Sequence, residues 1–329
     1  MVGAGAIGGF LGARLSLAGN AVTFIARGAN LAAIREGGMR LIEADGEERV
    51  ADAAAASAAE AGPHDLVLLA VKAHQVPDLA PQLSPLFGPD TPVVTLQNGV
   101  PWWFFHNLTG PYEGLVVRSV DPDGSIADHI ESRRVIGAVV YPASELVAPG
   151  VVKVIEGNRF TLGEPNGERS ARIEAIAEAF TGAGFRAPVS TDIRSEIWLK
   201  LWGNLVFNPV SALTHATLEE ICAFEPTRTL AATVMGEAKE VAEKLGVRVR
   251  VSIEKRIAGA AAVGAHKTSM LQDVEAGRAL ELEALTGAVV ELARLTRTPT
   301  PAIDAVHACA ALLARTLGAA GGRLRIEPA

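Results

Sequence analysis

The chain has 329 residues, of which 49% are hydrophobic and 20% are charged, and its formal net charge is −7. This composition argues against extensive disorder, and the length favours two domains over one. The acidic balance gives no electrostatic reason to expect nucleic acid or an anionic membrane as a partner.

The two cysteines, Cys222 and Cys309, make neither a metal-ligand spacing nor a disulfide framework, which is typical of a reducing compartment. We find no apolar run of the ~18 residues that a membrane span needs. The glycine-rich start also lacks the basic residues of a signal peptide. We therefore expect a cytoplasmic protein without a metal site or a membrane segment.

The first 125 residues alternate between strand-like and helix-like segments. Residues 20–27, 64–72 and 91–99 are apolar runs without polar alternation, as expected of strands buried on both faces. Residues 10–19 and 29–38 are helix-like, and glycine closes each of them. This order predicts an α/β fold with a Rossmann-type, doubly wound parallel sheet.

The pattern changes after this region. Residues 134–164 contain closely spaced short strands, which suggests antiparallel additions at one edge of the sheet, and a helix is expected over 167–184. We place the domain boundary so that 1–191 form the Rossmann-type domain and 192–329 form an all-helical C-terminal domain. Its predicted helices are 192–215, 218–246, 250–264, 270–296 and 300–317. The tail, 318–329, is expected to have little order.

A glycine-rich loop opens the chain with the pattern G-x-G-x-x-G, formed by Gly3, Ala4, Gly5, Ala6, Ile7 and Gly8. Such a loop makes a tight turn, lets its backbone approach a pyrophosphate and leads into a helix whose N-terminus attracts the anion. The pattern also arises by chance in a chain with 33 glycines, so a plain structural turn is the alternative. A helix and the strand 20–27 follow at the right distance, which favours dinucleotide binding.

The strand expected before this loop has little sequence to form it. Only Met1 and Val2 precede the glycines, whereas a central parallel strand usually has about five residues. Either the first strand is very short, or the start of the chain is truncated relative to its relatives.

The residue at the end of strand 20–27 discriminates between cofactors. An NAD site would carry an acidic residue there to accept a hydrogen bond from the ribose 2′-hydroxyl, but this chain has Arg27. A guanidinium can bind a 2′-phosphate and stack on adenine. The alternative is a solvated arginine at a strand end, and we favour NADP(H).

Two further polar residues end the next predicted strands. Lys72 closes the strand 64–72 and Asn98 falls at the end of 91–99. The carboxyl ends of parallel strands line the ligand crevice in such folds, although each residue alone could be a simple strand terminus. The aromatic run 101–105 could wall a pocket or anchor a helix, and the second reading is preferred.

The predicted helix 192–215 carries a polar stripe in an otherwise apolar segment. On an ideal helix, Lys200, Asn204 and Asn208 fall within about 80° of one another, and Glu196 and Ser211 extend the same stripe. A solvated face is the alternative, but two asparagines suit directed hydrogen bonds better than helix solvation. Pro209 is expected to kink the helix. The residue types fit carbonyl reduction, in which a lysine stabilises negative charge on the oxygen and delivers a proton.

Five segments together resemble the ketopantoate reductase (2-dehydropantoate 2-reductase) family: "GAGAIG", "VKAHQV", "LQNGV", "KLWGNLVFNPVSALT" and "KTSMLQDVEAGRALELEALTGAVVELA". The resemblance covers residues 2 to about 317. It implies NADPH-dependent reduction of ketopantoate to pantoate, a step toward pantothenate and coenzyme A. The resemblance further implies that Lys200 is the proton donor.

The resemblance also assigns binding residues. Those for the substrate would be Asn98, Asn204, Asn208 and Ser269. Those for the cofactor would be Gly3 to Gly8, Arg27, Lys72, Asn98, Ala143 and Glu281, of which Glu281 would also approach the catalytic lysine. Without the family, Ser269 reads as a helix N-cap and Glu281 as a helix-surface carboxylate.

The chain departs from the family after Glu281. The family often has Ile-Asp-Tyr-x-Asn-Gly there, whereas this chain has Glu283, Ala284 and Thr286 in those places, and "PWWFF" is also bulkier than expected. These changes leave open another small 2-oxo acid as the substrate. A non-catalytic NADP(H) sensor is a further alternative. The apolar helices of the second domain could form a homodimer interface.

Overall fold

The computed structural model describes residues 1–322, so most of the tail predicted to have little order lies outside the described residues. The chain divides into two compact units. The first consists of Met1–Val116 and Asp121–Glu196, and the second of Val117–Val120 and the chain from Ile197 onward. Because the helix 193–214 runs through this division, the predicted boundary at 191/192 stays a prediction.

The first unit is built on a mostly parallel sheet. Val2 bridges in parallel to both Ile25 and Leu69, so this single residue takes the place of a first strand. The resulting order is β4, β1, Val2, β5, β6, β7 and β10, with only β10 antiparallel. The strands are β1 Thr23–Ile25, β4 Ala54–Ala56, β5 Val67–Leu69, β6 Val93–Thr95, β7 Val135–Val140 and β10 Phe160–Gly163. The predicted doubly wound parallel sheet is confirmed.

A second sheet in this unit was not predicted. Its order is β3, β2, β9 and β8, formed by Glu48–Ala51, Met39–Ile42, Val151–Glu156 and Ala143–Ala148. Of the antiparallel additions expected at one edge from 134–164, β10 is confirmed, whereas β7 is parallel to β6 and β8 and β9 lie in the second sheet. All six residues of β7 are buried, and its first three, Val135 to Gly137, pair in parallel with β6. The strands β8 and β9 are partly exposed and belong to the second sheet.

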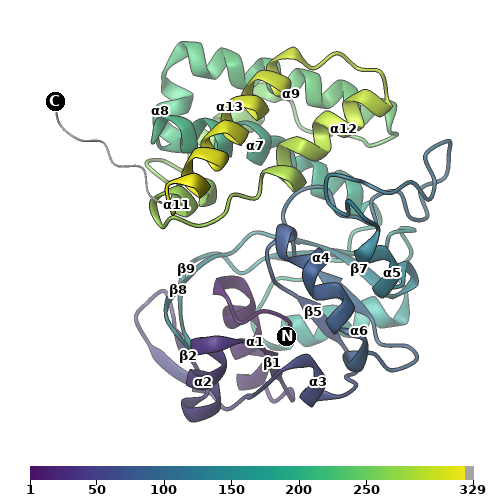
Figure 1. Ribbon diagram of the computed structural model, residues 1–329, viewed down its shortest axis with the longest axis vertical. Helices are drawn as coiled ribbons and strands as arrows, with labels where there is room; N and C mark the ends of the chain where they lie inside the picture. Colours follow the sequence, from purple (N-terminus) through teal and green to yellow (C-terminus); the bar gives the residue numbers. More distant parts are fainter. Residues whose placement is uncertain (323–329) are drawn as a thin grey trace. The chain divides into compact units, whose positions relative to one another are not determined.

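Helices and short turns connect and cover these strands (Figure 1). They are α1 Ala6–Leu17, α2 Gly28–Gly37, α3 Ala58–Ala61, η1 Ala73–Gln75, α4 Val76–Leu79, η2 Ala80–Gln82, η3 Ser84–Leu86, α5 Ser125–His129, η4 Ser132–Arg134 and α6 Ala171–Gly182. The rings of Phe10, in α1, and Phe185 pack edge-to-face with their centroids 5.1 Å apart, and the rings of Phe160 and Phe185 do so at 5.0 Å. This aromatic cluster packs α1 into the core and thereby fixes the helix that follows the glycine loop.

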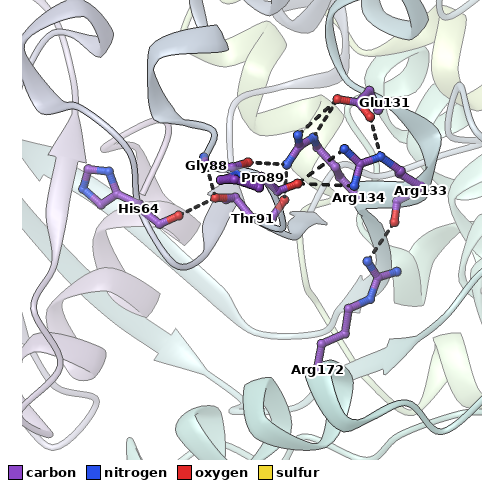
Figure 2. A network of polar contacts seen from close by, with 8 residues as sticks. All are labelled: His64, Gly88, Pro89, Thr91, Glu131, Arg133, Arg134 and Arg172. Carbon is purple, nitrogen blue, oxygen red and sulfur yellow. Dashed lines mark hydrogen bonds and ion pairs between the residues drawn. The ribbon is translucent and has the colours of Figure 1, made fainter.

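A polar network closes the amino-terminal edge of the parallel sheet (Figure 2). Just before β5 and β6, Thr91 Oγ1 donates to His64 O at 2.6 Å and accepts from Gly88 N at 2.9 Å. Before β7, Arg134 donates to Gly88 O at 2.8 Å and pairs with Glu131 at 3.1 Å. Because the strands are parallel, this network lies at the edge opposite to their carboxyl ends, which remain available for a ligand.

The described part of the second unit is helical. Its elements are most of α7 Ile193–Thr214, then α8 Leu218–Ala223, α9 Glu225–Lys244, α10 Ile253–Ala261, α11 Ser269–Glu275, the π-helix η5 Glu283–Gly287, α12 Ala288–Leu295 and α13 Pro301–Ala319. Two predicted helices are interrupted. The segment 218–246 breaks at Phe224, whose backbone is extended, and 270–296 breaks after Glu275, where Gly277 has a φ of 65°.

One helix departs from the expectation that no apolar segment is long enough to span a membrane. Within residues 1–322, α13 is long and apolar enough to cross a membrane by length and composition alone. Core helices of soluble proteins share this length and composition, and α13 packs against α9 and η5.

Candidate functional site

The glycine loop has the backbone geometry that a pyrophosphate-binding turn needs. Gly3 has a φ of 98°, which side chains rarely tolerate, and its N–H donates to Ile25 O at 3.0 Å. A Cβ on Gly8 would lie 2.0 Å from the carbonyl oxygen of Gly3. The turn therefore closes directly on the first turn of α1, and only glycine fits at both positions.

The N-terminus of α1 has the properties of an anion site. Its N-cap residue, Gly5, makes no side-chain cap, and the first turn contains no acidic residue. A Cβ on Gly5 would meet nothing within 4 Å, so space is open beside the loop. The helix dipole and the backbone N–H groups of this turn can therefore receive a phosphate.

Arg27 stands at the carboxyl end of β1, on the same edge of the sheet as the glycine loop. It is exposed and forms the N-cap position of α2. An exposed guanidinium here can reach a phosphate on the adenosine ribose, whereas the chain offers no acidic residue at this strand end.

Lys72 and Asn98 follow β5 and β6, which are neighbouring strands of the sheet. Both residues are half-buried. Gln97, which the sequence reasoning missed, joins these strand ends because its Nε2 donates to Leu69 O at 2.8 Å and Val71 O at 3.0 Å. Lys72 and Asn98, the predicted cofactor residues, therefore follow the carboxyl ends of two neighbouring strands.

The aromatic run after Asn98 serves as an anchor. Trp103 is buried, its Nε1 donates to Thr95 Oγ1 at 3.1 Å, and its ring covers Gly137. Arg194, at the start of α7, is also buried and donates to Phe104 O at 2.6 Å, as well as to the carbonyls of Pro165 and His106. These contacts match the anchoring alternative rather than a pocket wall.

Ala143 lies apart from these strand ends. It is the first residue of β8 in the second sheet and pairs with Glu156. Its side chain is half-buried. The expected contact of Ala143 with the cofactor stays a prediction.

The predicted polar stripe on α7 has a central group of three residues, and the residue at each end of the stripe makes a contact of its own. Ser211 is fully buried and its Oγ donates to Ala216 O at 2.6 Å, which closes the helix end. Glu196, which belongs to the first unit, lies 3.8 Å from Arg159. The central group is Lys200, Asn204 and Asn208, of which Asn208 is 6% exposed and the other two are half-buried.

Lys200 has a perturbed ionisation. Burial lowers the pKa of its ammonium to about 8, and the negative charge of Glu281 opposes this shift. A lysine with such a pKa remains mostly protonated at neutral pH and releases its proton more readily than an exposed lysine. This is the ionisation expected of a general acid.

Ser269 and the residues after Glu281 were also singled out in the second unit. The N-cap of α11 is Thr268, whose Oγ1 accepts from Leu271 N at 3.2 Å, so the reading of Ser269 as the cap is wrong. Ser269 is exposed at the first helical position. The divergent run 283–287 forms the π-helix, in which Thr286 is buried against His307 at 2.7 Å.

Known proteins resemble this chain over nearly its whole length. The family model "Ketopantoate reductase PanE/ApbA" matches residues 1–167, and its C-terminal counterpart matches 192–314. The chain is 56% identical to a 2-dehydropantoate 2-reductase of Mesorhizobium japonicum, over 95% of this chain and 96% of the relative. A protein of Ralstonia solanacearum assigned as a ketopantoate reductase has a TM-score of 0.93 at 43% identity, covering 96% of this chain and 97% of that one.

A solved D-mandelate dehydrogenase with NADH and anilino(oxo)acetate shares the fold alone. Its TM-score is 0.83 at 21% identity, and the match covers 97% of this chain and 100% of that one.

Proposed function

Because the chain belongs to the ketopantoate reductase family, we propose that it reduces 2-dehydropantoate (ketopantoate) to pantoate with NADPH, a step of pantothenate biosynthesis. The reaction adds a hydride to the 2-oxo carbon and a proton to its oxygen. NADPH supplies the hydride when bound. The observation that carries the proposal is Lys200, whose pKa is lowered to about 8 on a helix that also presents Asn204 and Asn208.

The residues of the first unit would hold the cofactor. Gly3 to Gly8 and the N-terminus of α1 would bind its pyrophosphate, and Arg27 would bind the 2′-phosphate. Lys72, Asn98, Ala143 and Glu281 are proposed as further cofactor contacts. The support for this assignment is the glycine turn, whose open side at Gly5 has room for the anion.

The residues of the second unit would bind the 2-oxo acid and provide the proton. Lys200 would donate its proton to the developing alkoxide, and its positive charge would stabilise that oxygen before the transfer. Asn204, Asn208 and Ser269, together with Asn98 of the first unit, would orient the substrate through hydrogen bonds without adding charge. Glu281 would keep Lys200 protonated.

This function assigns a role to each domain. Residues 1–191 would bind NADP(H), and 192–329 would bind substrate and could pair two copies as a homodimer. The enzyme would act in the cytoplasm, where its small acid substrate and NADPH are available. The departures at Glu283, Ala284 and Thr286 support keeping another small 2-oxo acid as the second candidate substrate.

The proposed reaction can be tested by following deuterium from labelled NADPH into the product. Purified chain is incubated with ketopantoate and NADPH deuterated at the transferred C4 position, and the product is examined by mass spectrometry. The proposal expects pantoate with deuterium at C2, and Lys200→Ala should lower the turnover by ~10²-fold or more while NADPH still binds. NADPH binding without any pantoate would refute it and favour the non-catalytic sensor.

A further inference from the structure

Asn30, in the first turn of α2, joins two distant parts of the first unit through its side-chain amide. Its Nδ2 donates to the carbonyl oxygen of Ala4 at 3.3 Å. Its Oδ1 accepts from the backbone N–H of Gly150, which is 120 residues away, at 3.0 Å. Ala4 belongs to the glycine loop, and Gly150 forms the turn between β8 and β9.

The two partners define which way the amide faces. Ala4 offers only a carbonyl and needs a donor, whereas Gly150 offers an N–H and needs an acceptor. An aspartate at position 30 could accept from Gly150 but would place a carboxylate oxygen against the carbonyl of Ala4. An alanine would make neither bond. Asparagine is therefore chemically matched to both partners.

The turn at Gly150 gives Asn30 a fixed anchor. Gly150 has a φ of 71°, and its carbonyl accepts from Arg40 N at 2.8 Å. A Cβ on Gly150 would lie 3.0 Å from the Cβ of Ala33 in α2. The turn is thus tied to the second sheet and packed closely on the helix that carries Asn30.

The bond to Ala4 orients a peptide group in the glycine loop. Among the described residues the peptide bonds are trans, so the carbonyl of Ala4 and the N–H of Gly5 point in opposite directions. Because Asn30 holds this carbonyl on its own side, the N–H of Gly5 is turned away from Asn30. Gly5 is also the residue beside which space is open.

We infer that Asn30 is a positioning residue for the pyrophosphate of NADP(H): it fixes the Ala4–Gly5 peptide so that its N–H faces the anion. This inference rests on the proposed function, since it takes NADP(H) as the ligand. It also gives the second sheet a role, because that sheet anchors Asn30 through Gly150. Asn30 itself would not touch the reacting atoms.

The experiment compares two ligands with wild type, Asn30→Ala, Asn30→Asp and the control Asn20→Ala. Asn20 is matched because its Nδ2 donates to Leu15 O at 2.9 Å, near the other end of α1. Binding of NADPH and of adenosine 2′-phosphate, which lacks the pyrophosphate, is measured by calorimetry. Turnover at saturating NADPH is measured alongside.

Asn30→Ala should raise the Kd of NADPH by ~10-fold, as expected for one lost hydrogen bond that orients a charged contact. The Kd of adenosine 2′-phosphate and the kcat should change by less than about 2-fold, because Arg27 and Lys200 are untouched. Asn30→Asp, which keeps the bond to Gly150 and with it the fold, should weaken NADPH binding further. Asn20→Ala should leave both affinities unchanged.

Equal losses for the two ligands, or a loss as large in Asn20→Ala, would overturn the positioning role. An unchanged Kd of NADPH in both Asn30 variants would also overturn it, while wild-type activity on ketopantoate would leave the proposed function standing. A wild type that binds adenosine 2′-phosphate but neither binds NADPH nor reduces a 2-oxo acid would instead refute the proposed function, and the inference with it.

Discussion

The carboxylate of Glu281 acts electrostatically on the ammonium of Lys200, although the two residues lie far apart in the sequence. Burial lowers the pKa of Lys200 to about 8, and Glu281 limits that change because a negative charge favours the protonated amine. The two effects together keep the proton on Lys200 at neutral pH while making it easier to transfer. Glu281 precedes the helical segment that begins at Leu282 and is half-buried, so its reading as a helix-surface carboxylate is wrong.

The pH dependence of ketopantoate reduction should reveal the effect of Glu281 on the pKa of Lys200. Lys200 must be protonated to act as an acid, so kcat/KM should be level at neutral pH and fall by about tenfold per pH unit above about pH 8. Glu281→Gln removes the negative charge that raises the pKa, so the decline should start at lower pH. Glu275→Gln is the control, since Glu275 pairs with Lys267 at 2.7 Å. An alkaline limb that does not move in Glu281→Gln would contradict the pairing.

The polar stripe of α7 should divide into residues that bind substrate and residues that hold the helix. Asn208→Ala should raise the KM of ketopantoate by ~10-fold, the usual effect of one lost hydrogen bond. Ser211→Ala removes a bond to Ala216 O and should lower the free energy of unfolding by about 1 kcal/mol without changing KM. Steady-state kinetics and urea unfolding of both variants check this. An unchanged KM in Asn208→Ala together with a raised KM in Ser211→Ala would show that Ser211, and not Asn208, binds the substrate.

Arg27 should determine the choice between NADPH and NADH. Its replacement by alanine removes a charge-assisted bond to the 2′-phosphate, so kcat/KM for NADPH should fall by at least ~10-fold while that for NADH changes little. The measured quantity is the ratio of the two values in wild type and variant. A wild type that prefers NADH would mean that Arg27 is a solvated strand terminus.

Alanine substitutions at two glycines of the loop should weaken NADPH binding for different reasons. Gly8→Ala places a Cβ 2.0 Å from the carbonyl oxygen of Gly3, so the loop must move and the protein should lose stability as well as NADPH binding. Gly5→Ala meets nothing within 4 Å and should fold normally, but its methyl group would enter the space proposed for the pyrophosphate. Thermal unfolding and NADPH binding separate the two. Normal NADPH affinity in Gly5→Ala would place the anion elsewhere.

The parts of the fold that could be predicted from sequence are those set by local patterns. The buried strands and the glycine loop follow from continuous apolar runs and from one motif. The second sheet could not be predicted because its strands β2 and β9 are short and pair across a long separation, with Arg40 opposite Val151. Nothing in either segment alone specifies that partner.

In the candidate site, too, only the features set by a local pattern could be predicted from the sequence. The angular position of Lys200, Asn204 and Asn208 was available from the helical period. That Ser211 uses its hydroxyl within the helix end, and that Asn30 holds the glycine loop, depended on partners brought together only by the fold. A polar residue can be placed on a face from sequence, but its hydrogen-bond partner cannot.

The most direct test of the proposed function is a comparison of substrates with NADPH in excess. The kcat/KM of the purified enzyme is measured for ketopantoate, pyruvate, 2-oxoisovalerate and benzoylformate. We predict that ketopantoate exceeds each of the others by ~10²-fold or more, because the analogues lack the hydroxyl that the asparagines would bind and the enzyme would leave those amides unpaired. Selective turnover of another 2-oxo acid, with ketopantoate inert, would contradict the assignment.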